Sequence, residues 1–185
     1  MIRLTATSHD LAAPGPRVAV LLAALVGVCI ASTPASARPP SPAPAAGDVE
    51  ARAKLLVEAV RNNDPKKAHP FFFPGGDFAE VKAIKDPAKY FDYLIRVYDK
   101  DVLTLREKLS SPDTVEFVRF DLGRGRNWVP NFKEANKAPY YATYKSRLVV
   151  KDAGKEKTFF VRVMISWKGQ WYCTHLLRKS LNERI

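Results

Sequence analysis

A cysteine and a histidine two residues apart near the end of the chain are the residues best suited to chemistry. Cys173 and His175 lie in the stretch SWKGQWYCTHLLRK, together with Trp167 and Trp171. A thiol beside an imidazole is typical of nucleophilic catalysis, and both groups also bind metals. Same-face neighbours two residues apart on a strand are separated by about 6.5–7 Å, however, which is too far for a thiol–imidazole hydrogen bond.

Metal and nucleotide chemistry have little support. Beyond residue 37, the neutral nitrogen and sulfur ligands are His69, Cys173 and His175. A metal site needs three or four converging ligands, so we predict no metal and no cofactor. The sequence also lacks a glycine-rich phosphate loop and a Gly-x-Ser-x-Gly motif, which leaves nucleotide-binding and α/β-hydrolase functions unsupported.

The functional question therefore falls on His175. A histidine on an apolar strand face is usually a core residue with its hydrogen bonds satisfied. The alternative is a ligand contact at the mouth of a pocket, and for that case we predict walls from Tyr98, Tyr144 and Trp171.

The first 37 residues are predicted to be a secretory signal peptide. Arg3 and Arg17 precede an uncharged apolar run of 14 residues, 18–31, and small residues end the segment at Ala37. This predicts an exported protein, periplasmic or extracellular. The alternatives are a membrane anchor, which needs about 20 apolar residues, and a lipoprotein modified at Cys29.

The remaining chain divides into a linker and one domain. Residues 38–47, RPPSPAPAAG, are predicted to form an extended proline-rich linker. Residues 48–185 number 138, enough for a single hydrophobic core. After signal cleavage Cys173 has no partner for a disulfide, so this core must hold without one.

Positive charge is concentrated in the second half of the domain. Residues 48–114 contain 12 basic and 12 acidic residues, whereas residues 115–185 contain 15 basic against 6 acidic ones, leaving +9. Such a charge can serve solubility alone, or it can attract an anionic partner outside the cytoplasm, such as an envelope component. We expect no nucleic-acid partner, because no nucleic-acid-binding motif is present.

Helical periodicity dominates the first half. Residues 48–64 and 87–109 carry apolar residues at helical spacing, and Asp48 and Asp86 are placed to cap their starts. Between them, HPFFFPGGDF (residues 69–78) cannot be a regular helix. We expect it to be a plug on the core or, alternatively, a lid hinged at its glycines. Asp99 and Asp101 are expected on the solvated flank of the second helix.

From residue 115 the apolar period changes to two. Five strands are predicted, at residues 115–123, 126–131, 140–150, 158–167 and 171–177. Helices followed by an antiparallel sheet of four or five strands predict an α+β fold.

A turn at Ala153-Gly154 would set the register of the two long strands. The pairs Leu148–Phe159, Tyr144–Val163 and Ala142–Ile165 would then share an apolar face. The opposite face would carry Lys145, Arg147 and Arg162 as an anion- or partner-binding group. Lys145 would lie across from Arg162, with both side chains splayed into water or bridged by an anion or by an acid of a partner subunit.

Two registers are open for the last hairpin. A two-residue type II′ turn with Gly169 as its first residue would pair Trp167 with Tyr172. A three-residue loop at 168–170 would pair Trp167 with Trp171 and turn Cys173 and His175 toward the core. We predict the second, because it buries the more apolar set.

The order of elements and the terminal Trp-x-Gly-x-Trp-type hairpin resemble the NTF2-like superfamily. The matching residues are Trp167, Gly169, Trp171 and His175, and the resemblance covers residues 49–177. It implies a bent sheet wrapped around helices as a cone, with an internal pocket and dimerisation through the outer sheet face. Isomerase-type members use a tyrosine and two carboxylic acids inside the cone. Here no inward Asp or Glu is predicted from Tyr140 to Leu177, and Asp121 is the nearest candidate.

These observations predict an exported, non-enzymatic binding or interaction module. Its expected partners are a small apolar ligand in the cone, an anionic envelope component on the basic sheet face, or a second copy as a homodimer. The alternative is a small-molecule isomerase, cyclase or hydratase with His175 as acid or base. That alternative requires an inward carboxylate near His175.

Overall fold

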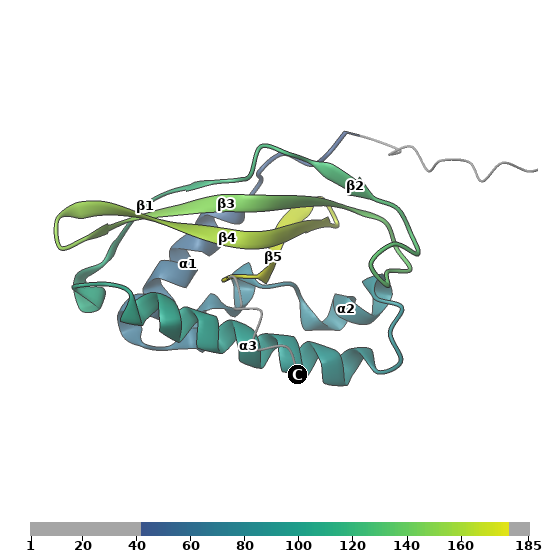
Figure 1. Ribbon diagram of the computed structural model, residues 1–185, viewed down its shortest axis with the longest axis horizontal. Helices are drawn as coiled ribbons and strands as arrows, with labels where there is room; N and C mark the ends of the chain where they lie inside the picture. Colours follow the sequence, from purple (N-terminus) through teal and green to yellow (C-terminus); the bar gives the residue numbers. More distant parts are fainter. Residues whose placement is uncertain (1–41, 178–185) are drawn as a thin grey trace, which may run out of the picture. The chain divides into compact units, whose positions relative to one another are not determined.

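The computed structural model describes residues 42–177 (Figure 1). The predicted signal peptide, Cys29 and the first linker residues lie outside this range. The helices are α1 (Val49–Asn62), the 3-10 helix η1 (Pro65–Phe71), α2 (Gly75–Val81), α3 (Pro87–Glu107) and the 3-10 turn η2 (Pro112–Thr114). The strands are β1 (Glu116–Asp121), β2 (Asn127–Val129), β3 (Tyr140–Asp152), β4 (Lys155–Trp167) and β5 (Gln170–His175).

The strands form one open antiparallel sheet, so the predicted α+β fold is confirmed. Its order is β1-β3-β4-β5, and β2 also pairs with β3. The helices form a layer against it, with α3 running along the length of the sheet (Figure 1). None of the helices described within residues 42–177 is long and apolar enough to cross a membrane.

The two long helices occupy the predicted places. α3 buries Leu94, Tyr98, Val102 and Leu105, and the carboxylate of Asp86 caps it by accepting from the Lys89 amide at 3.0 Å. Asp48 is the N-cap residue of α1, as predicted, but its side chain makes no capping hydrogen bond.

Asp99 and Asp101 are more than a solvated flank. Asp99 lies 2.8 Å from His69 Nε2, and Asp101 accepts from the Leu177 amide at 3.0 Å. The two carboxylates therefore tie α3 to η1 and to the residues that follow β5.

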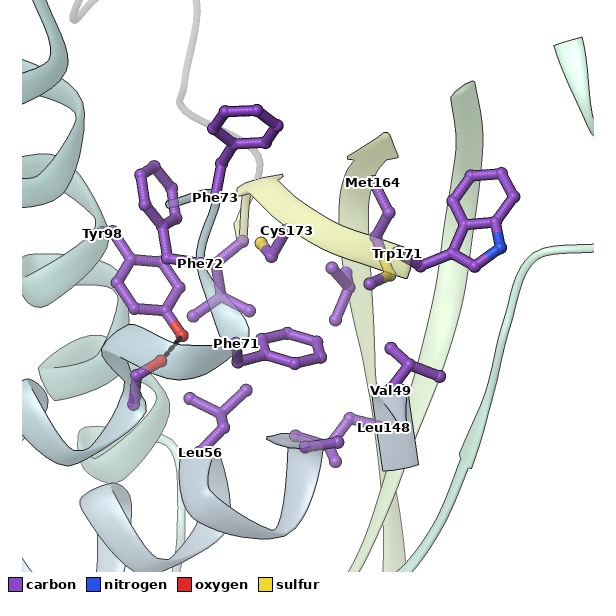
Figure 2. Packing of buried hydrophobic residues seen from close by; sticks show 14 of the residues in the cluster. Val49, Leu56, Phe71, Phe72, Phe73, Tyr98, Leu148, Met164, Trp171 and Cys173 are labelled. Atoms are coloured by element: carbon purple, nitrogen blue, oxygen red, sulfur yellow. Dashed lines mark hydrogen bonds between the residues drawn. The ribbon is translucent and has the colours of Figure 1, made fainter. Parts of the chain in front are cut away.

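Three consecutive phenylalanines form the predicted plug. Phe71, Phe72 and Phe73 are buried in the core (Figure 2), and the Phe73 amide donates to the Cys173 carbonyl at 2.9 Å. The lid alternative does not fit this burial. The glycines are not a hinge either, since Gly75 begins α2, a short helix that the sequence analysis missed.

The end of the predicted linker packs onto the domain. The Trp171 indole donates to the Pro44 carbonyl at 3.1 Å, and Ala43 packs partly buried against the core. Contacts with the domain therefore extend into the predicted linker, several residues before Asp48.

The register of the two long strands is confirmed. The observed pairs include Leu148–Phe159, Tyr144–Val163 and Ala142–Ile165, as the turn at Ala153-Gly154 predicted.

The faces of β3, however, change phase at Lys145. On its N-terminal side Thr143 is fully buried and Tyr144 is exposed. On its C-terminal side the buried residues are Ser146, Leu148, Val149, Val150 and Asp152. Lys145 has a φ of 57°, in the left-handed region, and the ladder skips it between Tyr144 and Ser146. Because strand side chains alternate with period two, one such residue turns the following side chains to the other face.

The predicted apolar face is therefore interrupted. Ala142, Ile165 and Leu148 are buried as predicted, but Thr143 and Met164 of the opposite face are buried as well, and Tyr144 is exposed. Leu148 joins the core together with Met164, the partner of Thr143, and Figure 2 shows both in the cluster around Phe71.

The last hairpin follows neither expected register. Its turn is Lys168-Gly169, with φ values of 47° and 77°, and Trp167 pairs with Gln170. Two positive φ values in a two-residue loop are typical of a type I′ turn, which matches the twist of the strands. A bulge then places Thr174 between the pairs Met164–Cys173 and Val163–His175. Cys173 stays buried and His175 becomes exposed.

A close backbone crossing explains Gly123. In Gly123→Ala the added carbon would lie 2.4 Å from both Thr143 Oγ1 and the Tyr144 carbonyl oxygen. We expect this overpacking to lower the free energy of unfolding by about 1–3 kcal/mol. The matched control is Gly76→Ala, in α2 with no heavy atom within 4 Å of the new carbon. It should be neutral or stabilising by up to about 1 kcal/mol. Urea unfolding measures both, and equal midpoints would contradict the close crossing.

Asp152 should give the stability a dependence on acid pH. Its buried carboxylate accepts from the Ser110 and Ser111 amides at 2.8 Å each, and these bonds, with Lys157 nearby, lower the pKa of Asp152 below its usual 3.8. A carboxylate with a lowered pKa stabilises the fold above its unfolded pKa and stops doing so as pH falls through the folded one. Asp152→Asn should therefore reduce the urea midpoint at pH 7, with a difference that shrinks between pH 4 and pH 2.

The control for this comparison is Asp92→Asn, at an exposed position on α3. It should leave the midpoint unchanged across the same pH range. If Asp152→Asn lowers the urea midpoint as much at pH 2 as at pH 7, the charge of the Asp152 carboxylate does not stabilise its link to Ser110 and Ser111.

Candidate functional site

A cavity of about 250 Å³ opens between the sheet and the α2–α3 end of the helical layer. Its lining residues are Phe78, Lys82, Ile84, Tyr90, Leu94, Glu134, Ala135, Tyr140, Tyr144, Val163, Ile165, Thr174 and His175. The volume corresponds to about eight water molecules in the liquid, which suits a ligand of about one ring.

The floor of the cavity is apolar and its mouth is polar. Phe78, Leu94 and Ile165 are buried, whereas Glu134 and His175 are exposed. A ligand would therefore bury its apolar body and keep a polar end near the mouth.

The structure brings together two of the four predicted ligand-binding residues. His175 and Tyr144 line the cavity, and both reach it through the backbone irregularities at Thr174 and Lys145. The other two, Tyr98 and Trp171, lie in the core and do not line this cavity. Tyr98 donates its hydroxyl to the Ala68 carbonyl at 3.0 Å (Figure 2).

The bulge at Thr174 separates Cys173 from His175. Cys173 is fully buried, and burial raises the pKa of its thiol well above the usual value. A protonated, enclosed thiol is a poor nucleophile. His175 stands at the mouth of the cavity with Nδ1 3.2 Å from Thr174 Oγ1. A Cys–His catalytic pair is therefore absent from this hairpin.

Lys82, Tyr140 and Glu134 form the polar end of the cavity. The Lys82 ammonium donates to Tyr140 Oη at 3.1 Å and to the Glu134 backbone carbonyl at 3.3 Å. The Tyr140 hydroxyl donates to Glu134 Oε2 at 3.0 Å. An ammonium has three N–H donors, so this arrangement leaves one for a ligand acceptor.

The surroundings shift the pKa values of Lys82 and Tyr140 in opposite directions. Burial lowers the pKa of Lys82, an effect that the charge of Glu134 opposes. Burial, followed by the charge and hydrogen bond of Glu134, raises the pKa of Tyr140 well above its usual value. The Tyr140 hydroxyl is therefore a protonated donor at neutral pH.

Asp77 positions α2, which supplies Phe78 to the floor. Its carboxylate accepts from the Trp167 indole at 3.0 Å and from the Lys168 ammonium at 2.9 Å. The Lys168 hydrogen bond, with the Trp167 bond, lowers the pKa of Asp77 despite partial desolvation. The β4–β5 hairpin and α2 are thereby locked together.

The predicted basic group on the sheet is exposed but partly neutralised. Lys145, Arg147 and Arg162 are all exposed. Arg147 lies 3.1 Å from Asp121, and Arg119 lies 3.5 Å from the same carboxylate oxygen. Asp121 is therefore on this outer face and not in the cavity. Anion binding by the group stays a prediction.

Sequence reasoning missed Lys82, Tyr140 and Glu134. Lys82 follows a short helix, and Glu134 lies in the loop between β2 and β3 with a φ of 50°. No periodicity marks such positions. Across residues 42–177, no cluster of three or more His, Cys, Asp or Glu side chains is arranged to hold a metal ion.

Comparison of the chain with protein-family models, with curated proteins and with solved structures found no match. The geometry of the cavity is therefore the basis for a functional proposal.

Proposed function

We propose that this chain is an exported binding module whose cavity holds a small, mainly apolar molecule with a hydrogen-bond acceptor at one end. The observation that carries the proposal is the pairing of an apolar floor with the remaining N–H donor of Lys82. His175 and Tyr144 would contact the ligand near the mouth. Export rests on the apolar run at residues 18–31.

The polar end supports binding more than proton transfer. Glu134 already accepts a hydrogen bond from Tyr140, and its backbone carbonyl accepts from Lys82, so these groups hold one another in place. The NTF2-like resemblance agrees with an internal pocket, but it names no ligand.

A larger side chain inside the cavity should weaken ligand binding. Val163 lines the cavity, and Val163→Phe should weaken binding of p-cresol and benzoate, two single-ring probes with polar heads, by at least about tenfold. The same change on β1, Val118→Phe, is the matched control and should leave binding within about twofold. Chemical shift changes in two-dimensional NMR spectra measure the binding. If neither probe shifts resonances of the cavity residues, or if Val163→Phe binds as the unmodified chain does, the proposal is wrong.

An enzyme of the isomerase, cyclase or hydratase type is the second candidate. The observation in its favour is that Glu134 supplies a carboxylate to the same cavity as His175. A general base typically contributes a factor of about 10²–10⁴. On this candidate, the chain should accelerate exchange of the α-protons of cyclopentanone in D₂O, and His175→Ala should lower that rate by about 100-fold.

His69→Ala is the control, since His69 pairs with Asp99 away from the cavity. It should leave the exchange rate unchanged. Probe binding without any acceleration of exchange supports the binding module and rejects the enzyme.

A further inference from the structure

The loop between β2 and β3 holds Phe132 in solvent. Its side chain is 83% exposed, and the next most exposed large apolar residue within residues 42–177 is Phe160 at 58%. A phenylalanine left this open contributes little to the core, and it is informative only if it belongs to a larger apolar surface.

The loop is fixed in this position. Asn136 is fully buried, and its side-chain amide donates to the carbonyls of Pro130 and Ala138 at 3.1 and 2.8 Å. The Ala83 amide donates to the Ala135 carbonyl at 2.8 Å, which ties the loop to the segment after α2. Phe132 is therefore presented on a preorganised support, and little ordering would accompany its burial by a partner.

More exposed aromatic rings stand near the same opening. Tyr90 lines the cavity, as does Ala135 from the loop of Phe132. Tyr93 follows one turn later on α3, with its ring 6.1 Å from that of Tyr90, and both tyrosines are exposed. In Figure 1 the start of α3 and the loop after β2 lie at the same end of the helix–sheet layers.

Exposed lysines flank these rings in the sequence. The exposed ones flanking the cavity residues are Lys85, Lys89, Lys133 and Lys137. Within the described part of the chain none of the four has an acidic side chain within 4.0 Å. The acidic residues of the same segments are Asp86, Asp92 and Glu134, and counting Lys82 the balance is five positive to three negative charges.

We propose that this rim, Phe132 with Tyr90, Tyr93 and the four lysines, docks onto an anionic phospholipid bilayer. Phenylalanine and tyrosine favour the membrane interface, and lysines are drawn to anionic headgroups. The net charge of +2 at the rim is opposite in sign to that of an anionic bilayer and would attract the rim to it. Docking in this orientation would turn the mouth of the cavity toward the lipid. It requires no ligand in the cavity and stands apart from the proposed function.

The first test is sedimentation of the full chain with vesicles of phosphatidylcholine and phosphatidylglycerol at a 3:1 ratio. We expect binding that falls with rising salt and is weak on phosphatidylcholine alone. Phe132→Ser should weaken partition by about tenfold, and Lys133→Gln with Lys137→Gln by about tenfold or more.

Matched controls exist on the outer face of the sheet. Phe160→Ser and the pair Lys145→Gln with Arg162→Gln should each leave partition within about twofold. Loss of binding in these controls, with retention in the rim variants, would assign lipid binding to the sheet face and overturn the proposal. Equal partition of all variants, or no binding to the anionic vesicles, would also overturn it.

A local readout separates docking by the rim from binding by residues 18–31. Phe132→Trp should shift its emission to shorter wavelength and be quenched by brominated phosphatidylglycerol, whereas Phe160→Trp should not. The alternative is that a second copy of the chain covers the rim, and light scattering tests this by measuring the molar mass in solution. A dimer that Phe132→Ser converts to a monomer would overturn lipid docking in favour of self-association.

Discussion

The left-handed backbone at Lys145 is the constraint on which the rest of the sheet depends. A strand that alternates strictly would present one face to the helices along its whole length. β3 and β4 do not alternate in this way. Beyond Lys145 they bury Leu148 and Val161, whereas nearer β2 and β5 they bury residues of both faces, Thr143 and Met164 as well as Ala142 and Ile165. The interruption at Lys145 reconciles the two halves without changing the pairing of the strands.

The cavity is a consequence of that change of phase. Tyr144, which a regular strand would have placed beside Leu148 in the core, faces α2 and α3 instead. The bulge at Thr174 has the same effect on β5, since it leaves Cys173 inside and brings His175 to the mouth. Two local departures from regular strand geometry therefore deliver the side chains that line one opening, as bulges beside binding sites commonly do.

The fold was predictable from sequence to a greater extent than the site. Helical and two-residue periodicity located the long helices and all the strands, and the Ala153-Gly154 turn predicted the β3–β4 register, because these signals are local. Which side chains of the strands face the core could not be predicted. Lys145 is neither glycine nor asparagine, so nothing in its residue type marks a positive φ. The same holds for Thr174, and every residue beyond such a position is assigned to the wrong face.

The polar end of the cavity was out of reach for a different reason. Lys82 and Tyr140 are separated by 58 residues, and the Tyr140 hydroxyl donates to Glu134 in a loop whose conformation is set by tertiary hydrogen bonds. Of these three residues only Tyr140 lies in a regular element, so no pattern could place them together. Their arrangement nevertheless follows a simple rule: a half-buried ammonium needs hydrogen-bond acceptors and a nearby opposite charge. Glu134 and Tyr140 meet that need while leaving one donor of Lys82 unused. A domain that required only stability could have filled this space with aliphatic side chains and gained packing contacts. Keeping an open apolar floor under a nearly satisfied lysine is the arrangement expected of a site that receives a ligand.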